Sequence, residues 1–285
     1  MINQKKHLAT QGLLHALRLR RDLGIDLCDP LCVFDIAVAK GLEIWFINTP
    51  SIEAVYSKTP QPVITLSSGR PLVRQAYSCG HELGHHIFGH GTRVEKFAGG
   101  FDSNNPEEFL AECFAGYLLM PPTAICRAFS QRGWNVSSPL PHQILTVASQ
   151  YGVGYTTLIY HLQSALKLLE RRLADDLLRQ SLPTIRKQLV GEPCRKNVVV
   201  VDQFWGKMPI DLTVGDLLLL PPDSVTEGDC VEKYRRIRGG LIFEATRKGI
   251  GRFENIILHL SAYIRVSDRD YVGRSDYRHL GEEDE

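Results

Sequence analysis

The sequence predicts an α+β protein built in three parts, and three observations lead to this fold class. Residues 1–135 alternate helical patterns with short β-rich runs, residues 136–192 keep a helical pattern throughout, and residues 193–285 consist of β-rich segments broken by Gly and Pro. A chain of 285 residues is long enough to bury two or three separate cores. We therefore expect two α+β parts joined by a helical one.

Composition narrows the class of protein. Hydrophobic residues make up 44% and charged residues 23%, which is typical of a folded globular chain. A net charge of +1 gives no global basic field for nucleic acid or membrane binding. The N-terminus lacks the apolar stretch of a signal peptide, no window reaches 18 apolar residues, and the seven cysteines are odd in number and scattered. We expect a reduced, cytoplasmic protein without a membrane partner.

The first elements follow from periodicity and punctuation. Residues 8–23 carry apolar positions at helical spacing, and Gly24 ends that helix. A second helix is predicted to begin with Asp29 as its cap and Pro30 in its first turn. Two strands are predicted at "LEIWFI" and "PVITLSS", with a proline-containing loop between them.

Two further helices are predicted on either side of a loop. The first runs from about residue 74 to 89 and contains "YSCGHELGHHIFGH"; the loop is "AGGFDSNNP". In the second, Asn105 can cap, Pro106 suits the first helical position, and the pattern continues to Met120 before "MPP" stops it. The helical pattern of 139–190 includes a helix-turn-helix order in "ILTVASQYGVGYTTLIYHLQSAL".

The spacing of two histidines predicts a metal site. On a helix, His81 and His85 lie on one face and can bind one ion, while Glu82 can reach a bound water. The alternative is a pair of surface histidines. A catalytic zinc needs a third protein ligand. The next helix offers Glu108 and Glu112 on one face, so Glu108 could bind the metal while Glu112 orients one histidine from behind.

At this point the chain resembles a known family. "RQAYSCGHELGHHIFGH" resembles the "RxxFTxAHELGHxxLGH" block of the ImmA/IrrE metallopeptidases, and "EFLAECFAGYLLMP" resembles their "ExxANxFAxxLLMP" block, in the same order and spacing. The resemblance covers about the first 130 residues. It implies a zincin-like metallopeptidase domain in which His81, His85 and Glu108 bind zinc and Glu82 is the general base. Glu112 stands where the family usually has Asn or Asp.

The resemblance also implies an organisation and a function. Larger members carry a helix-turn-helix-like region and then a GAF-like domain, and the chain resembles in this respect the CapP peptidases of phage-defence operons, the subgroup to which we expect it to belong. We therefore expect a regulated zinc endopeptidase that cleaves a helix-turn-helix repressor and so derepresses a DNA-damage or phage-defence response, with single-stranded DNA as a candidate effector. Zn²⁺ is the expected metal, although Mn²⁺ competes at nitrogen and oxygen ligands.

Several neighbouring residues have weaker assignments. His86 and His90 are expected to be exposed or capping residues rather than ligands, since His86 has the wrong angle and His90 lies near the helix end. Cys113, ahead of Cys79, could supply a thiolate that inhibits as a fourth ligand, although a buried cysteine often acts only as a small hydrophobe. We expect the substrate to pair with an edge strand near "VITLS".

Two other functions compete with the regulated protease. One is a DNA-binding or transcriptional regulatory module with a structural metal site, but such a site should have lost Glu82, and the predicted recognition segment "YTTLIYHLQSALKLLE" has few residues that read bases. The other is a broad digestive peptidase, which the missing export signal and the additional domains disfavour.

Overall fold

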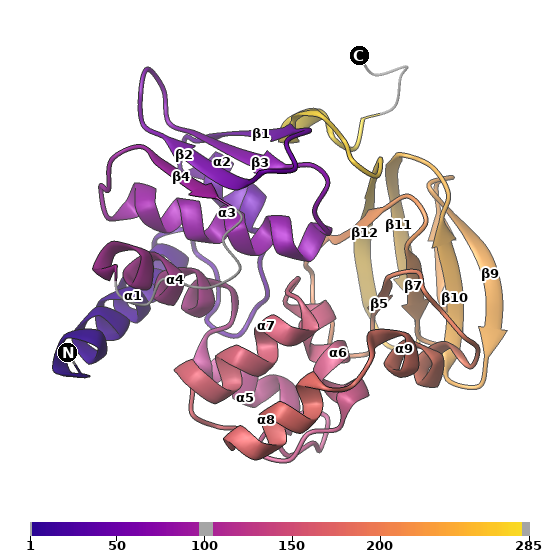
Figure 1. Cartoon of the computed structure of the whole chain (residues 1–285). Helices are drawn as coiled ribbons and strands as arrows, with labels where there is room; N and C mark the ends of the chain where they lie inside the picture. Colours follow the sequence, from indigo (N-terminus) through magenta and orange to yellow (C-terminus); the bar gives the residue numbers. More distant parts are fainter. Residues whose placement is uncertain (1, 97–104, 281–285) are drawn as a thin grey trace. The chain divides into compact units, whose positions relative to one another are not determined.

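The computed structural model describes residues 2–96 and 105–280, and it separates into two compact units (Figure 1). The first unit is Met1–Ala124 with Asp270–Asp276, and the second is Ile125–Arg269 with Tyr277–Glu285. The chain thus leaves the second unit, contributes a short segment to the first and returns. The domain boundaries expected at residues 135 and 192 stay predictions.

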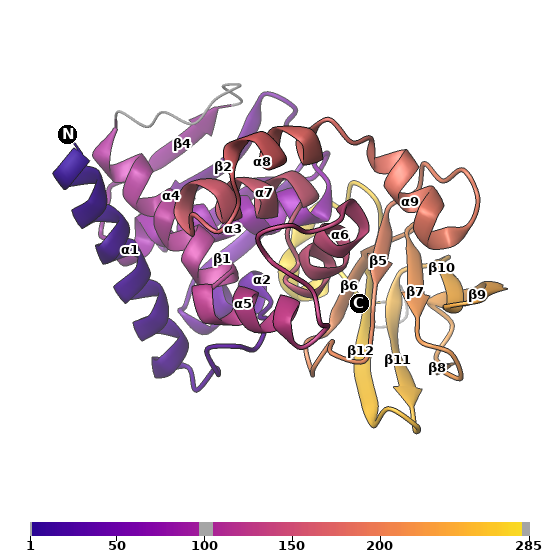
Figure 2. The ribbon, with the colours of Figure 1, turned by 90° about the horizontal axis from the view of Figure 1, so that it is seen from below.

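The first unit is a mixed sheet covered by helices. The strand order is β13-β1-β3-β2-β4, in which β1 and β3 are parallel and the other neighbours antiparallel. Helix α3 packs on β2 and β3, α4 packs on α3, and α1 packs on α4 (Figures 1 and 2). The elements are α1 (Ile2–Asp22), α2 (Val33–Ala39), β1 (Glu43–Ile47), β2 (Ile52–Ser57), β3 (Val63–Ser67), α3 (Leu72–Ile87), β4 (Arg93–Lys96), α4 (Pro106–Leu119) and β13 (Gly273–Arg274).

Three predictions for this unit need correction. The proline-containing loop holds a strand, β2, whose Glu53 is buried and paired with the guanidiniums of Arg70 and Arg74; a charged residue on the inward side hid the strand pattern. The second helix begins at Val33 with Cys32 as its cap, not at Asp29. The "VITLS" strand is central, because β3 pairs with β1 on one side and β2 on the other, so it offers no free edge to a substrate.

The start and end of α4 agree with the sequence. The Asn105 side chain accepts a hydrogen bond from the Glu107 amide at 3.0 Å, Pro106 occupies the first turn, and Met120 is the C-cap. Most of the preceding loop, residues 97–104, lies outside the described residues. Near the other end of α4, the fully buried Arg20 of α1 donates from Nε to the Leu118 carbonyl at 2.8 Å. This bond satisfies an end carbonyl of α4 and fixes the helix against α1.

The second unit begins with helices. Its helical part includes α6 and α7, joined by a turn in which Gly152 has φ +61°, a left-handed conformation that suits glycine. The helical prediction for 139–190 is met, whereas the helix-turn-helix-like function stays a prediction. The elements are α5 (Pro122–Ser130, across the unit boundary), α6 (Pro141–Gln150), α7 (Tyr155–Tyr160), a π-helical turn (His161–Ala165), α8 (Arg171–Leu178) and α9 (Leu182–Val190).

The rest of the second unit is a pair of sheets. One has the order β5-β7-β10-β9 and the other β6-β12-β11-β8. One apolar core contains side chains from both sheets, including Leu220, Phe243, Phe253 and Ile264, together with Trp205 from the connection between β5 and β6. The strands are β5 (Val198–Val200), β6 (Ile210–Thr213), β7 (Leu217–Leu220), β8 (Val225–Glu227), β9 (Val231–Ile237), β10 (Gly240–Ala245), β11 (Gly249–Asn255) and β12 (Leu260–Ser267).

This architecture corrects the α+β prediction for residues 193–285. From Val198 to Ser267 the regular elements are strands, joined by turns, so the two sheets cover each other and need no helix between them. The GAF-like assignment is not confirmed.

Within the part of the chain that the structure describes, one segment is long and apolar enough to span a membrane by length and composition alone. It runs from Pro106 to Ser130, but α4 ends at Leu119 and α5 begins at Pro122, and 67% of its most apolar window is buried inside the protein. Such burial is typical of the core helix of a soluble domain.

Candidate metal centre

Helices α3 and α4 bring three predicted ligands to one point. His81 Nε2 lies 3.1 Å from His85 Nε2 and 3.1 Å from Glu108 Oε2, and His85 Nε2 lies 3.5 Å from the same oxygen. Both histidines are buried and Glu108 is partly buried. Among the described residues these three form the group of His, Cys, Asp or Glu side chains whose ligand atoms could share one ion.

The spacing of these atoms fits a zinc ion. Zinc bonds to His nitrogen and carboxylate oxygen measure about 2.0–2.1 Å, so two ligand atoms of a tetrahedral site stand about 3.3–3.4 Å apart. The three observed separations span 3.1 to 3.5 Å. Two imidazoles and one carboxylate also leave a fourth tetrahedral position for water or substrate. The residues present therefore fit a catalytic-type zinc site.

Helices α3 and α4 approach each other more closely at Gly84 of α3 than at Gly80 of the same helix. A Cβ on Gly84 would stand 3.1 Å from Ala111 Cα and 3.2 Å from Ala111 O, whereas a Cβ on Gly80 would meet its nearest neighbour, the Cβ of Ala115, at 3.5 Å. A Cβ at Gly84 would therefore be tighter than an ordinary contact and would require α4 to shift slightly, whereas a Cβ at Gly80 would make ordinary van der Waals contacts. The glycine in the HExxH segment sets the distance between the helix of His81 and His85 and the helix of Glu108.

Behind His81 lies a carboxylate with its own partner. Glu112 Oε2 is 3.4 Å from His81 Nδ1, and its other oxygen accepts a hydrogen bond from the Tyr77 hydroxyl at 2.8 Å. This places Glu112 where the sequence predicted it, next to a ligand histidine and outside the ligand group. Tyr77 was missed; its position one helical turn before His81 on α3 was the available signal.

The other two histidines of the motif lie apart from the three ligands. His90 Nδ1 is 2.8 Å from His85 Nδ1, on the far side of that ring from the group. His86 bonds through Nδ1 to the Tyr56 hydroxyl at 2.9 Å, and burial, with Lys40 and Lys58, lowers the pKa of His86. Among the described residues, the group whose ligand atoms could share one ion does not include His86 or His90, although His90 contacts the candidate ligand His85.

Glu108 is held as a carboxylate. Its hydrogen bonds with His81 and His85 depress the pKa of Glu108 far below its ordinary value despite partial burial. Glu82, next to His81, is fully buried on α3. A buried carboxyl beside the ligand group suits a general base.

The cysteines do not join the ligand group. Burial, together with the Glu112 charge, raises the pKa of Cys113 to about 12, which keeps it a thiol. Its Cβ is packed so closely against α1 that a Cβ on Gly12 would stand 2.8 Å away. Among the described residues, Cys113 is not in the group whose ligand atoms could share one ion, and the inhibitory fourth ligand expected there stays a prediction. Cys79 is fully buried and behaves as a core residue.

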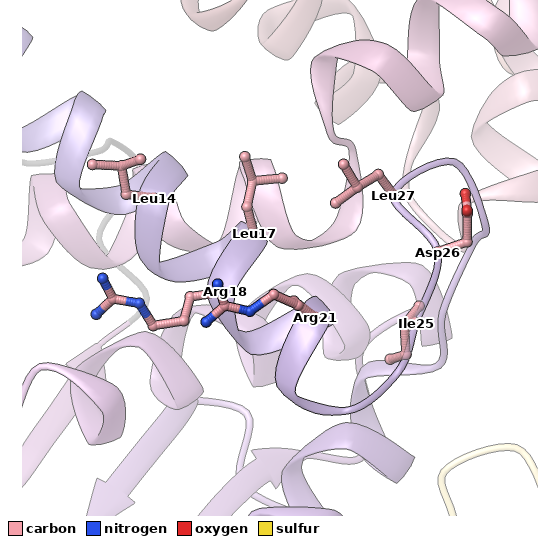
Figure 3. Close-up of a pocket in the computed structure, with 7 residues that line it drawn as sticks. All are labelled: Leu14, Leu17, Arg18, Arg21, Ile25, Asp26 and Leu27. Atoms are coloured by element: carbon pink, nitrogen blue, oxygen red, sulfur yellow. The ribbon is translucent and has the colours of Figure 1, made fainter.

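A surface pocket of about 450 Å³ lies elsewhere in this unit (Figure 3). It runs beside α1 and the segment after it, and its lining includes none of the three ligands. Leu14 and Leu27 are exposed there, and Arg18 and Arg21 project from α1. The candidate metal ligands and Glu82 are therefore not part of this pocket.

Comparisons with known proteins place the site in a family domain. Residues 40–163 match the model of the IrrE N-terminal-like domain, a peptidase family, and the match includes all three ligands and Glu82. A Mycobacterium tuberculosis transcriptional regulator of known structure is similar over 56% of this chain and 51% of its own, at 16% identity and a TM-score of 0.36. The match thus spans about half of that regulator. No curated protein gave a match.

Proposed function

We propose that this chain, whose residues 40–163 match the model of the IrrE N-terminal-like domain, is a regulated zinc-dependent endopeptidase. The observation that carries the proposal is the triangle of His81, His85 and Glu108, whose ligand atoms have the separations of a tetrahedral zinc site. Glu82 adds a carboxylate directly after the first ligand.

In this proposal the residues of the site have separate roles in peptide hydrolysis. Zinc held by the triangle would lower the pKa of a water to about 7 and polarise the scissile carbonyl. Glu82 takes the proton from the attacking water at a carboxylate oxygen and passes it to the nitrogen of the leaving amine. Glu112 holds His81 in the orientation its role requires, and Tyr77 holds Glu112.

The substrate and the regulation are part of the proposal. The resemblance to ImmA/IrrE peptidases favours a helix-turn-helix repressor as the substrate and derepression of a DNA-damage or phage-defence response as the result. The second compact unit contributes none of the three ligands and not Glu82, so we assign it the regulatory role. Single-stranded DNA is the first effector to try, Mn²⁺ the alternative metal, and the cytoplasm the proposed compartment.

A cleavage assay tests the proposal. Purified full-length protein loaded with Zn²⁺ is incubated with the helix-turn-helix repressor encoded next to it, with and without single-stranded DNA. A matched sample carries Glu82→Gln, which keeps the size of the side chain and removes its basicity. We expect one defined cut, slowed by 10²- to 10⁴-fold in the variant, as for loss of a general base.

The opposite result would favour another function. If zinc is bound in stoichiometric amount and the repressor stays intact under every condition, the metal is structural and the chain is a DNA-binding or regulatory module. Rapid cleavage of casein without an effector would instead indicate a broad peptidase.

A further inference from the structure

The end of helix α3 brings His90 back onto the ligand His85. Gly89 has φ +69°, and its amide donates to the His86 carbonyl at 3.1 Å, while the His90 amide donates to the His85 carbonyl at 3.0 Å. These two bonds form a Schellman motif, which requires a left-handed residue, here glycine, after the C-cap. The motif reverses the chain and ties the His90 backbone to the residue whose ring it faces.

The side chain of His90 completes this arrangement. Its Nδ1 lies 2.8 Å from Nδ1 of His85, which is the nitrogen turned away from Glu108 and His81. The ring of His90 stacks on Phe88, with centroids 5.8 Å apart and planes at 27°. Phe88 in turn packs edge-on against Phe114 of α4. Backbone and ring contacts therefore both fix where His90 stands.

We propose that His90 is a positioning residue that sets the tautomer and orientation of His85 for metal binding, an inference that rests on the zinc site of the proposed function. A histidine that binds metal through Nε2 must carry its proton on Nδ1. His85 then donates from Nδ1, and His90 accepts at Nδ1 in its neutral form, with its own proton on Nε2.

The two ligand histidines would then be held in the same way by different chemistry. His81 turns its Nδ1 toward the carboxylate of Glu112, and His85 turns its Nδ1 toward the imidazole of His90. Partners of this kind typically contribute 10- to 100-fold to metal affinity. The glycine and histidine that follow the HExxH segment thus belong to the metal site through the helix end they form.

The experiment compares three variants by zinc affinity. His90→Phe keeps a ring to stack on Phe88 and removes the acceptor, whereas His90→Asn places an amide oxygen near the position of the lost Nδ1. His15→Phe is the matched control, because His15 also packs its ring on Phe88, at 4.9 Å, from α1. Zinc affinity is measured by competition with a chelator, and the tautomer of His85 by ¹H–¹⁵N spectra of the zinc-loaded protein.

We expect zinc affinity to fall 10- to 100-fold in His90→Phe, to recover in His90→Asn, and to change less than threefold in His15→Phe. The Nδ1–H signal of His85 should stay in the wild type and in His90→Asn and broaden in His90→Phe. The melting temperature of the metal-free protein reports general unfolding separately. Unchanged affinity in His90→Phe, with wild-type protein binding zinc, refutes only the role of His90, and a wild type that binds no zinc refutes the proposed function as well.

Discussion

Each compact unit contains a cluster of ionisable side chains that is largely buried, and these two clusters have opposite balances of donors and acceptors. In the first unit, two imidazoles and one carboxylate direct their acceptor atoms to a common point, and a second carboxylate, Glu112, stands behind them. No Lys or Arg belongs to that set. A metal cation at that point can take a lone pair from each of the three side chains. We call His81, His85 and Glu108 the acceptor cluster.

In the second unit, a largely buried carboxylate is neutralised by arginine side chains of the same unit. Asp211 of β6 receives Arg265 at 2.6 and 2.9 Å and Arg278 at 3.1 Å, and Arg278 donates to His279 at 2.6 Å. Arg278 is 3% exposed. Burial alone would raise the pKa of Asp211, but Arg278 and Arg265 outweigh it and lower that pKa to about 2. We call Asp211, Arg265, Arg278 and His279 the arginine cluster.

This difference shows how to separate a functional cluster from a structural one. The arginine cluster holds two guanidiniums for one carboxylate, so it is already compensated, and added positive charge would be repelled. Its role is to fasten residues 278 and 279 to the second unit. The acceptor cluster contains no Lys or Arg side chain, and the separations of its ligand atoms have the dimensions of a zinc site. Burial and perturbed pKa values occur in both clusters, so neither property identifies the functional one.

The largest expected effect comes from removing a ligand. His85→Ala leaves two of the three acceptors, so zinc affinity should fall by more than 100-fold, beyond the loss typical of an outer partner, and cleavage should disappear. Asp211→Asn should bind zinc as the wild type does. Metal content after dialysis and chelator competition measure both. Equal zinc binding by wild type and His85→Ala would contradict the assignment of the acceptor cluster.

The second effect is on stability and belongs to the arginine cluster. Asp211→Asn leaves the buried Arg278 and the partly buried Arg265 without their carboxylate, and breaking a buried pair of this kind typically costs about 3–5 kcal/mol. Urea unfolding of the second unit measures this change. Asp229→Asn breaks the exposed pair with Arg247, whose side chains are 72% and 59% exposed, and should cost no more than about 1 kcal/mol. If Asp211→Asn and Asp229→Asn lower the free energy of unfolding by similar amounts, the arginine cluster stabilises the second unit no more than an exposed ion pair does.

A third effect is the pH dependence of the second unit. Burial, followed by the Arg278 charge, lowers the pKa of His279 from 6.5 to about 3. The pKa of His279 is lower in the folded than in the unfolded state. Its contribution to the free energy of unfolding is therefore complete above pH 6.5 and is lost as the pH falls toward 3. At pH 5 the loss is about 2 kcal/mol. Urea unfolding at pH 7 and 5, with chelator present, should show a smaller difference in His279→Gln, whereas the exposed His7→Gln should match the wild type.

The sequence predicted the parts of the fold that depend on local signals. Asn105 and Pro106 start α4 through a cap and a fixed φ, which are properties of a few adjacent residues. Strand β2 escaped because its buried Glu53 gains its stability from Arg70 and Arg74, which belong to later segments. The all-strand nature of residues 198–267 escaped because sheets covering one another depend on long-range pairing, such as the parallel pairs β5–β7 and β6–β12.

In the candidate site, too, local sequence signals predicted some residues, whereas residues that depend on long-range contacts were missed. The spacing of His81 and His85 is a helical property, and Glu108 was reached through the resemblance and the face it shares with Glu112. Tyr77 and His90 were missed as parts of the site because their roles depend on contacts. Tyr77 reaches α4, and His90 returns to His85 only after Gly89 reverses the chain. The final histidine of the motif was therefore placed outside the site by its position near the helix end.

The smallest effect tests whether the acceptor cluster depends on the spacing of its helices, as the arginine cluster does not. Gly84→Ala adds a Cβ 3.1 Å from Ala111 Cα, so α4 must move by a few tenths of an ångström and carry Glu108 with it. Gly80→Ala adds the same atom where the nearest neighbour lies at 3.5 Å. Both gain helix propensity of about 0.5–1 kcal/mol. Gly80→Ala should therefore be neutral or stabilising with unchanged zinc affinity, whereas Gly84→Ala should lose about 1 kcal/mol of stability and bind zinc more weakly. If zinc affinity is the same in both, the position of Glu108 does not depend on the close approach at Gly84, and the helix end at His90 is then the stronger determinant of the site.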